Sequence, residues 1–257
     1  MSAQRMTRGE MLAGAAPIVL LIGVWHAIAA SGLAPPALLP PPLAVFARLG
    51  EQLANPTFRD HATTTLLRLF CGFVIAVVLG VGLGLAATMS RLAGHIVKPL
   101  VRVLAPIPKV ALYPAFILVL GFEHASKIAL VVADATFPIL LATWQGTAAV
   151  EPKLVWSARA AGASPLRITF GVVLMAALPS VLTGARIGLV IACIVVFLAE
   201  MITSSDGLDH LLVRASRNFQ TVDMFVPLIT ISLFGLALNV GFNALRRRLL
   251  AGFAEEG

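Results

Sequence analysis

Long apolar blocks, separated by short polar stretches, dominate this sequence. A block of about 20 apolar residues is long enough to cross a hydrocarbon core of about 30 Å as an α-helix. Of the 257 residues, 59% are hydrophobic and only 12% are charged, whereas soluble domains carry about 25% charged residues. One soluble core cannot bury so large an apolar excess, and the sequence predicts an all-α polytopic membrane protein. The six expected transmembrane helices cover residues 11–30, 63–88, 103–121, 126–144, 174–202 and 225–245.

The first apolar block allows two interpretations. Its small residues Ala27 and Ala29 are similar to those at a signal-peptide cleavage site. The block is long for a signal core, however, so we expect an uncleaved first span. Five prolines within 35–42 exclude a helix there. Apolar residues then recur at helical spacing over 43–55, which predicts a short helix lying at the membrane interface.

Glycines and prolines within the expected spans indicate how these helices pack. Two Gly-x-x-x-Gly pairs, at 80–84 and 184–188, permit close helix contact in lipid. The third expected span is interrupted by Pro106, Pro108 and Pro114. Prolines are tolerated in a span where neighbouring groups or water satisfy the freed carbonyls. We therefore expect this span to face a cavity, with Pro106 and Pro108 on a translocation path.

Asp134, Glu200 and Arg68 are ionisable residues that lie inside the apolar blocks or at their boundaries. Such groups are expensive in lipid and usually face a cavity or a partner. Asp134 lies near mid-span, and we expect it at the translocation path; a protonated acid bonded to a neighbouring helix is the alternative. Glu200 lies at the outer end of the fifth expected span. Its side chain could equally well face the path or reach to the membrane surface. We expect Arg68 to reach the membrane surface, with attraction of anions toward the path as the alternative.

The distribution of Lys and Arg predicts the orientation of the chain. With the N-terminus inside, thirteen of these residues, Arg5 among them, fall on the inner side and six on the outer side. Cytoplasmic loops carry such an excess, so both termini and the polar segment 150–168 are expected in the cytoplasm. The net charge of +7 does not indicate nucleic-acid binding, because the basic residues are scattered over loops and the chain has one Tyr.

Catalytic and metal-binding patterns are missing from the sequence. The five His residues have no metal-ligand spacing, and Cys71 and Cys193 lie far apart in apolar blocks. Residues 121–128 resemble a phosphate-binding loop, but Ser126 replaces its second Gly and Ile128 replaces its Ser or Thr. We therefore expect no enzyme activity and no cofactor in this chain.

The polar segment 150–168 forms a helix of its own between two expected spans. Its alanines favour a helix, and Gly162 followed by Pro165 predicts the helix end, because Gly accepts a left-handed cap and Pro cannot continue the helix. Such a segment is either a connector on the bilayer surface or a handle that a soluble partner binds.

In this segment Ala158 is followed by three residues and Gly162, and nine further residues lead to Val172 and Leu174. This spacing resembles the cytoplasmic loop of the permeases of ATP-binding-cassette (ABC) importers. That signature reads Glu-Ala-Ala, three residues, Gly, nine residues, then Ile-x-Leu-Pro. Residues 105–108, 120–123, 126–128 and 177–189 look like the nitrate, sulfonate and taurine branch of this family. The signature is matched at Ala158, Gly162 and Leu174, is replaced conservatively at Ser157 and Val172, and is not followed at Trp156 and Met175.

The resemblance implies a type I ABC importer permease fold, in which this segment is a cytoplasmic coupling helix docked on a separate ATPase that binds the ATP. Arg159 and Arg167 would pair with carboxylates of the ATPase, a solvated charge being the alternative for each. Gly162 would allow two backbones to approach closely. The coupling residues implied by the resemblance are Ser157, Ala158, Arg159, Gly162, Ala163 and Ser164.

The resemblance also implies partners, a location and a substrate class. Two permease copies, most simply a homodimer, would enclose the path in a bacterial inner membrane, and an extracytoplasmic binding protein would deliver a small solute. An anion such as a sulfonate, taurine, nitrate or bicarbonate is expected. An ion-gradient-driven secondary transporter would need several paired intramembrane charges and inverted repeats. An intramembrane enzyme would need a clustered His, Asp or Ser site, and neither alternative explains the spacing of the signature.

Overall fold

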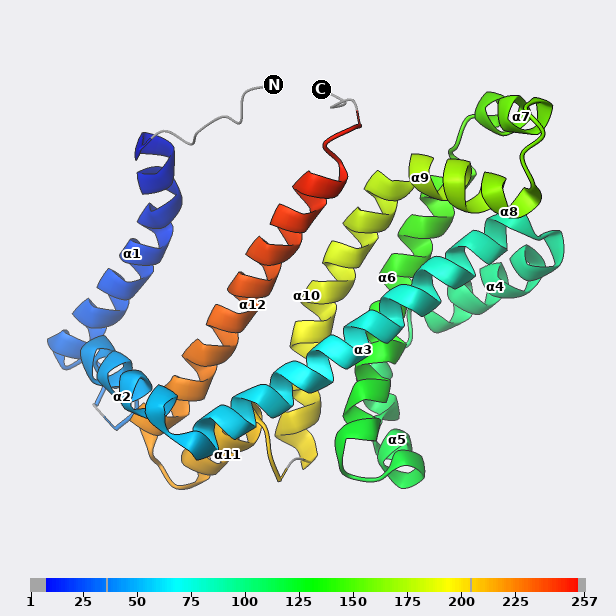
Figure 1. The fold of residues 1–257 in the computed structure, drawn as a ribbon. Helices are drawn as coiled ribbons and strands as arrows, with labels where there is room; N and C mark the ends of the chain where they lie inside the picture. The colour runs from blue at the N-terminus through cyan, green and yellow to red at the C-terminus, as the bar shows by residue number, and fades with distance from the viewer. Residues whose placement is uncertain (1–7, 36, 204, 254–257) are drawn as a thin grey trace.

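The structure is a computed structural model that describes residues 8–35, 37–203 and 205–253, with side chains from residue 16 onward. Arg5, which the orientation argument includes, lies outside the described residues. The long helices are α1 (Arg8–Ser31), α3 (Pro56–Met89), α6 (His124–Ala148), α10 (Leu178–Thr203) and α12 (Thr221–Leu249). The shorter ones are α2 (Pro42–Ala54), α4 (Arg91–Leu104), a 3₁₀ turn (Lys109–Leu112), α5 (Tyr113–Leu120), α7 (Pro152–Ala160), α8 (Pro165–Ile168), a π-helical turn (Thr169–Val173), α9 (Leu174–Ala176) and α11 (Leu208–Arg217) (Figure 1).

Four helices, α3, α6, α10 and α12, are long and apolar enough to cross a membrane. Helix α4 and the helical segment Lys109–Leu120 would make a fifth span if counted together. The described apolar part of α1, Ala16–Ser31, is shorter than the ~20 residues that a span needs. The chain is thus an all-helical multi-pass membrane protein whose described residues contain four or five candidate spans, where the sequence predicted six.

The third expected span, 103–121, differs most from the prediction. Helix α4 begins already at Arg91 and ends at Leu104, and the chain bends by 91° before the helical segment that follows. Pro106 and Pro108 cause this break, because each lacks an N–H donor and disfavours the α conformation in the residue before it. The bend therefore lies where the prolines were expected to open the helix.

The start of α10 also differs, at Leu178 where the fifth span was expected from 174. Residues Pro165–Ala176 instead form a helix of their own, which contains the π-helical turn Thr169–Val173. Pro179 has no N–H to donate to the carbonyl one turn earlier, so this helix ends just before α10. Helix α3 begins before the expected 63, at Pro56, where the side chain of Asn55 accepts a hydrogen bond from the Thr57 N–H. The predicted helix over 43–55 is confirmed as α2.

Helix α6 is the centre of the bundle and packs between α3 and α10. A Cβ added at Gly80 or Gly84 of α3 would lie 2.7 or 2.6 Å from the side chains of Ile139 and Thr143. A Cβ added at Gly188 of α10 would lie 2.8 Å from the side chain of Ile139. Both predicted Gly-x-x-x-Gly pairs therefore bring backbones close, and they do so on two sides of the same helix.

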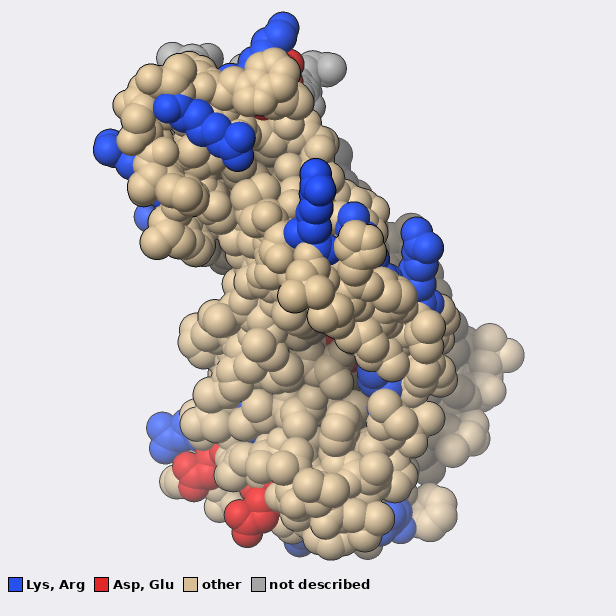
Figure 2. Space-filling model, turned by 90° about the vertical axis from the view of Figure 1, so that its right-hand side faces the viewer, with Lys and Arg blue, Asp and Glu red and all other residues tan. Residues whose placement is uncertain are grey.

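Different helices lie at the two ends of the bundle. The start of α1, the end of α12 and the short helix α7 lie at one end, whereas α2, α5 and α11 lie at the other (Figure 1). On the face shown in Figure 2, charged side chains gather toward the two ends and leave a largely uncharged belt between them. The belt is the surface that a hydrocarbon core would cover.

The glycine contacts predict which substitutions the bundle tolerates. Gly80→Leu should lower the free energy of unfolding by about 1–3 kcal/mol, because a well-packed contact has no room for added methylenes. Gly82→Leu is the matched control, since nothing lies within 4 Å of a Cβ there. Thermal unfolding of both purified variants in detergent measures the difference. Equal losses at the two positions would contradict the packing of α3 on α6.

Candidate functional site

Helix α7 stands clear of the bundle, and none of its residues is buried (Figure 1). Trp156 is 62% exposed on it. The helix ends as predicted: Gly162 has a left-handed φ of +78°, and the Ala163 N–H donates to the Ala158 carbonyl. Nothing in this chain lies within 4 Å of a Cβ placed at Gly162. The backbone at the end of α7 is therefore open to a partner.

The residues expected to couple to an ATPase all lie at the exposed end of the molecule that carries α7. Ala158 and Ala163 are half-buried, and the other four are exposed. The Ser164 side chain caps α8 by accepting a hydrogen bond from the Arg167 N–H. An exposed Trp beside basic residues on an isolated helix is typical of a binding surface, since Trp and Arg are enriched in interfaces. The local structure thus fits a handle better than a connector.

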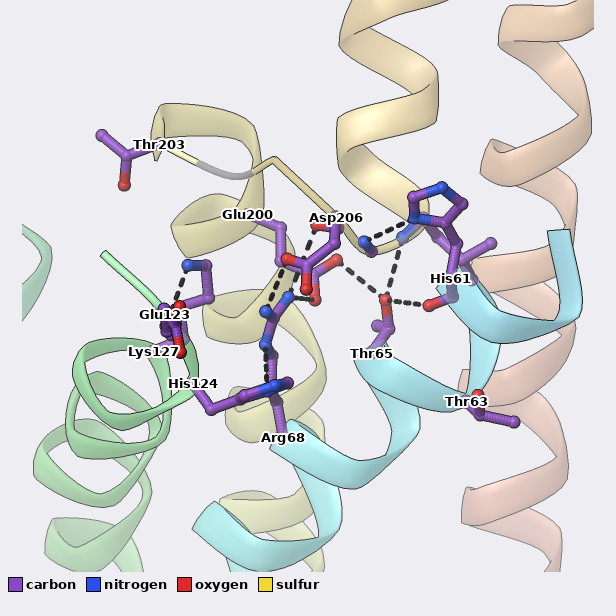
Figure 3. Close-up of polar contacts among 12 residues, drawn as sticks. His61, Thr63, Thr65, Arg68, Glu123, His124, Lys127, Glu200, Thr203 and Asp206 are labelled. Carbon is purple, nitrogen blue, oxygen red and sulfur yellow. Dashed lines mark hydrogen bonds and ion pairs between the residues drawn. The ribbon is translucent and has the colours of Figure 1, made fainter. Parts of the chain in front are cut away.

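At the opposite end, Arg68 is the centre of a buried cluster of charges (Figure 3). Its Nη1 donates to Glu200 Oε1 at 2.8 Å and its Nη2 to Asp206 Oδ1 at 2.6 Å. Its Nε donates to His124 Nδ1 at 3.1 Å. The side chains of Arg68 and Glu200 are both 0% exposed. We call these residues, with Thr65, the Arg68 cluster; it joins α3 to α6, α10 and the loop before α11.

The expectation that Arg68 reaches the membrane surface is wrong. A position at the membrane surface, one of the two considered for Glu200, is wrong as well. Both side chains turn inward, because each satisfies the other's charge and hydrogen-bonding groups within the bundle. A lone guanidinium would have to reach water, but a paired one whose three nitrogens all form hydrogen bonds can stay buried. The sequence signal was two isolated charges in apolar blocks, which does not reveal that they meet.

The start of α11 is fixed by the same cluster. Thr65 Oγ1 donates to Glu200 Oε2 at 2.8 Å and accepts from the Leu208 N–H at 2.9 Å. The Gly207 N–H donates to His61 Nδ1 at 2.9 Å. Gly207 has a φ of +96°, and a Cβ there would lie 2.3 Å from the Glu200 carboxylate. Only glycine fits both the backbone and the space at this position, directly before α11.

Two aspartates beside the cluster have shifted acidities. Burial raises the pKa of Asp206, but the hydrogen bond and charge of Arg68, with Lys127 and His124, outweigh it and hold the pKa below its usual value. Asp209 in α11 is 2% exposed, and within the described structure its Oδ2 has no hydrogen-bond partner. Burial and the Glu200 charge raise the pKa of Asp209 to about 8. At neutral pH Asp209 is therefore mostly protonated.

A second charged pair lies at the proline break. Lys109 Nζ is 3.7 Å from Asp134 Oδ1 and donates to the Ala105 carbonyl at 2.8 Å. The same ammonium lies 4.3 Å from the centre of the Phe137 ring. Asp134 thus pairs with Lys109, the residue that directly follows Pro108 at the break. Glu200 lies in the Arg68 cluster instead. Lys109 was missed because it lies in a short turn 25 positions before Asp134, and no periodicity links that turn to α6.

Comparisons with known proteins give these features a context. The family described as "Binding-protein-dependent transport system inner membrane component" matches residues 76–254. The taurine transport system permease protein TauC of Escherichia coli is 29% identical over 243 residues, 93% of this chain and 88% of that protein. A probable ABC transporter permease protein of Brucella melitensis is 32% identical over 228 residues, 89% of this chain and 92% of that protein.

One solved structure shows the fold. A chain of the MetNI methionine ABC transporter, in an inward-facing conformation, superposes with a TM-score of 0.58 at 19% identity. The match covers 80% of this chain and 96% of that chain. The helices described above therefore have the arrangement of an ABC importer permease.

The raised pKa of Asp209 predicts a pH dependence of stability. A carboxyl whose pKa is about 8 when folded and near its usual value when unfolded stabilises the fold fully only below that usual value. Its contribution is lost as the pH rises through about 8. Asp209→Asn should therefore gain stability over the wild type by up to about 1.4 kcal/mol per pH unit in this window. The free energy of unfolding in detergent from pH 5 to pH 9 measures this difference, and Asp60→Asn at an exposed position is the control. Parallel pH profiles for the wild type and Asp209→Asn would contradict the prediction.

Proposed function

Because the chain belongs to the family of binding-protein-dependent transport system inner membrane components, we propose that it forms the membrane path for a small oxyanion-bearing solute, such as a sulfonate. The family assignment makes it the permease component of a binding-protein-dependent ABC importer, working with a separate ATPase and a substrate-binding protein. The chain is not itself an enzyme, and the ion-gradient alternative is set aside. The substrate, the orientation and the subunit arrangement are the proposal.

The substrate class rests on a relative and on a charge. A permease named for taurine, itself a sulfonate, is similar to this chain over 93% of its length. The carboxylate of Asp134 would repel an anion if it stood alone, but the Lys109 ammonium lies 3.7 Å away. This pairing removes the lone negative charge from the middle of the bundle. Nitrate and bicarbonate remain members of the same class of small anions.

The proposed path runs beside the proline break. Pro106 and Pro108, both exposed, and the partly exposed Asp134 would form part of its wall. Glu200 has no exposed side-chain surface, so we assign it to the support of the path and not to its lining. Two copies of the chain in the bacterial inner membrane would enclose the path as a homodimer.

The proposed orientation places both termini and α7 in the cytoplasm. The six crossings expected from the sequence then comprise α1, the bent pair of α4 and α5, and the four long apolar helices. Helix α7 would dock on the ATPase through Trp156, Ala158 and the open backbone of Gly162. The excess of Lys and Arg expected for cytoplasmic segments supports this orientation.

Uptake by the reconstituted importer tests the proposed substrate. The complex of this chain with its ATPase and binding protein should take up radiolabelled taurine or ethanesulfonate into proteoliposomes only when ATP is supplied on the ATPase side. Choline, a cation of similar size, should not enter. Transport of another class of solute, with no uptake of sulfonate, would contradict the proposal.

The pairing of Lys109 with Asp134 predicts a particular pattern of variants. Breaking a buried pair by removing one partner costs about 3–5 kcal/mol, whereas replacing both partners by apolar residues is often neutral. Asp134→Leu and Lys109→Met should each reduce uptake strongly, and the double variant should recover much of it. Asp134→Asn removes the carboxylate charge but keeps a hydrogen-bond acceptor for Lys109, so it should retain more uptake than Asp134→Leu and less than the wild type. Full uptake by Asp134→Leu alone would remove Asp134 from the path.

The coupling role of α7 has a matched control at the other end of the molecule. Gly162 and Gly121 have φ of +78° and +82°, and nothing lies within 4 Å of a Cβ at either. A bulky residue therefore strains the backbone at both positions, and more at Gly121, whose ψ of −179° lies in a region that essentially only glycine adopts. Gly162→Leu should weaken co-purification of the ATPase or uncouple hydrolysis from uptake, while Gly121→Leu should keep the ATPase bound. Normal assembly and uptake by Gly162→Leu would rule out docking there.

A further inference from the structure

A hollow of about 350 Å³ lies between the last turn of α10 and the helix α11. Its volume is in the range of small-molecule sites, roughly 300–1,000 Å³. Residues at helical spacing on one face of α11 form one wall, and the end of α10 forms the other. The lining residues are Glu200, Met201, Ile202, Thr203, His210, Val213, Arg214, Arg217 and Asn218.

The hollow adjoins the proline-broken segment. Thr203 on its wall donates a hydrogen bond to the hydroxyl of Tyr113, the fully buried first residue of α5, at 3.1 Å. Helix α5 follows directly on the 3₁₀ turn that carries Lys109. A solute in the hollow is therefore next to the segment proposed to line the membrane path. Figure 1 shows α11 at the end of the bundle opposite α7, and thus at the end proposed to be external.

The charge of the hollow is positive. Arg214 and Arg217 are exposed, and within the described structure neither forms an ion pair. The nearby carboxylates do not compensate them, because Glu200 and Asp206 are both engaged by Arg68 (Figure 3). Asp209 is buried and mostly protonated at neutral pH. Among the described residues, Arg214 and Arg217 therefore line the recess without an acidic side chain that neutralises them.

We propose that this hollow is an outer anion site, in which Arg214 and Arg217 bind the oxyanion group of a small solute before it enters the membrane path. A guanidinium presents paired N–H donors that match the oxygens of a sulfonate, carboxylate or phosphate group. His210, stacked on His61 with ring centres 5.9 Å apart, lines the same wall. The identity of the solute as a sulfonate, and its arrival from outside, rest on the proposed function.

The same guanidinium groups would attract carboxylates on the surface of the binding protein. The concave shape favours a small solute, because a carboxylate on a protein surface reaches the rim of a recess more readily than its wall. If these arginines served only to dock the binding protein, the proposal would be wrong.

A cysteine on the wall reports the anion preference directly. Val213→Cys is placed in a background with Cys71→Ser and Cys193→Ser, and the permease–ATPase complex is used without binding protein. Its rates of reaction are measured with two thiosulfonate reagents, one bearing a sulfonate and one bearing a trimethylammonium group. Relative to a small free thiol, the site should favour the anionic reagent on the order of 10-fold, because a basic recess concentrates anions.

Charge variants assign this preference to the two arginines. Arg214→Gln combined with Arg217→Gln should abolish the preference. Arg59→Gln, which removes an exposed arginine at the start of α3 outside the hollow, should leave it unchanged. Asn218→Cys, a second lining position, replaces Val213→Cys if that variant does not fold. A preference that survives loss of both arginines would overturn the proposal.

Protection separates the possible ligands. Added ethanesulfonate should slow the anionic reagent in the absence of binding protein. If only the binding protein slows it, the arginines serve protein docking and the proposal is wrong. If ethanesulfonate protects but the reconstituted importer takes up no sulfonate, the anion site stands and the proposed substrate fails. If sulfonate is taken up without protection, the proposed function stands and the outer site fails.

Discussion

The buried guanidinium of Arg68 constrains the half of this molecule that carries α2, α5 and α11 more than any other group. A charge without exposed surface is tolerated only when all of its partners are in place, because removing one partner of such a pair costs about 3–5 kcal/mol. Glu200 from α10 and Asp206 from the following loop meet this demand at 2.8 and 2.6 Å. The loop must therefore return to α3, and Gly207 is the residue that lets it pass the Glu200 carboxylate. The position of α11, and of the hollow beside it, follows from this pairing.

The half that carries α7 is organised by contact and not by charge. Glycines on α3 and α10 bring both helices against α6, so the three helices form one closely packed unit. Helix α7, by contrast, has no buried residue. An importer must pass a movement driven by ATP at one end to a solute at the other. The packed unit of α3, α6 and α10 lies between the exposed helix α7 and the Arg68 cluster, and it is suited to that task. The proline break at 105–108 lies beside this unit, where the path is proposed.

Local chemistry in the sequence foretold much of this arrangement. Apolar length predicted the four long helices, the glycine pairs predicted their close contacts, and Gly162 predicted the left-handed end of α7. Helix α4 was missed because Arg91, His95 and Lys98 interrupt its apolar residues, so it does not form a long apolar block. Such polar residues are compatible with an amphipathic helix that packs on one side only. Each of these features depends on residues within a few helical turns of one another.

The charged sites could not be predicted, because their partners are far apart in the chain. Arg68 and Glu200 are separated by 132 positions, and no periodicity links them. An isolated charge in an apolar block indicates that a partner exists but does not identify it. Lys109 and Asp134 illustrate the same limit at shorter range, since the bend before α5 decides whether they meet.

The orientation of the chain underlies the coupling role of α7, the outer anion site and the direction of transport. It is measured by labelling single cysteines with a membrane-impermeant maleimide in spheroplasts, in a background with Cys71→Ser and Cys193→Ser. Glu151→Cys, at the start of α7, and Asn218→Cys, at the end of α11, are exposed positions at opposite ends of the bundle. We expect Asn218→Cys to react in intact spheroplasts and Glu151→Cys to react only after permeabilisation. The reverse pattern, or labelling of both positions from the same side, would contradict the account.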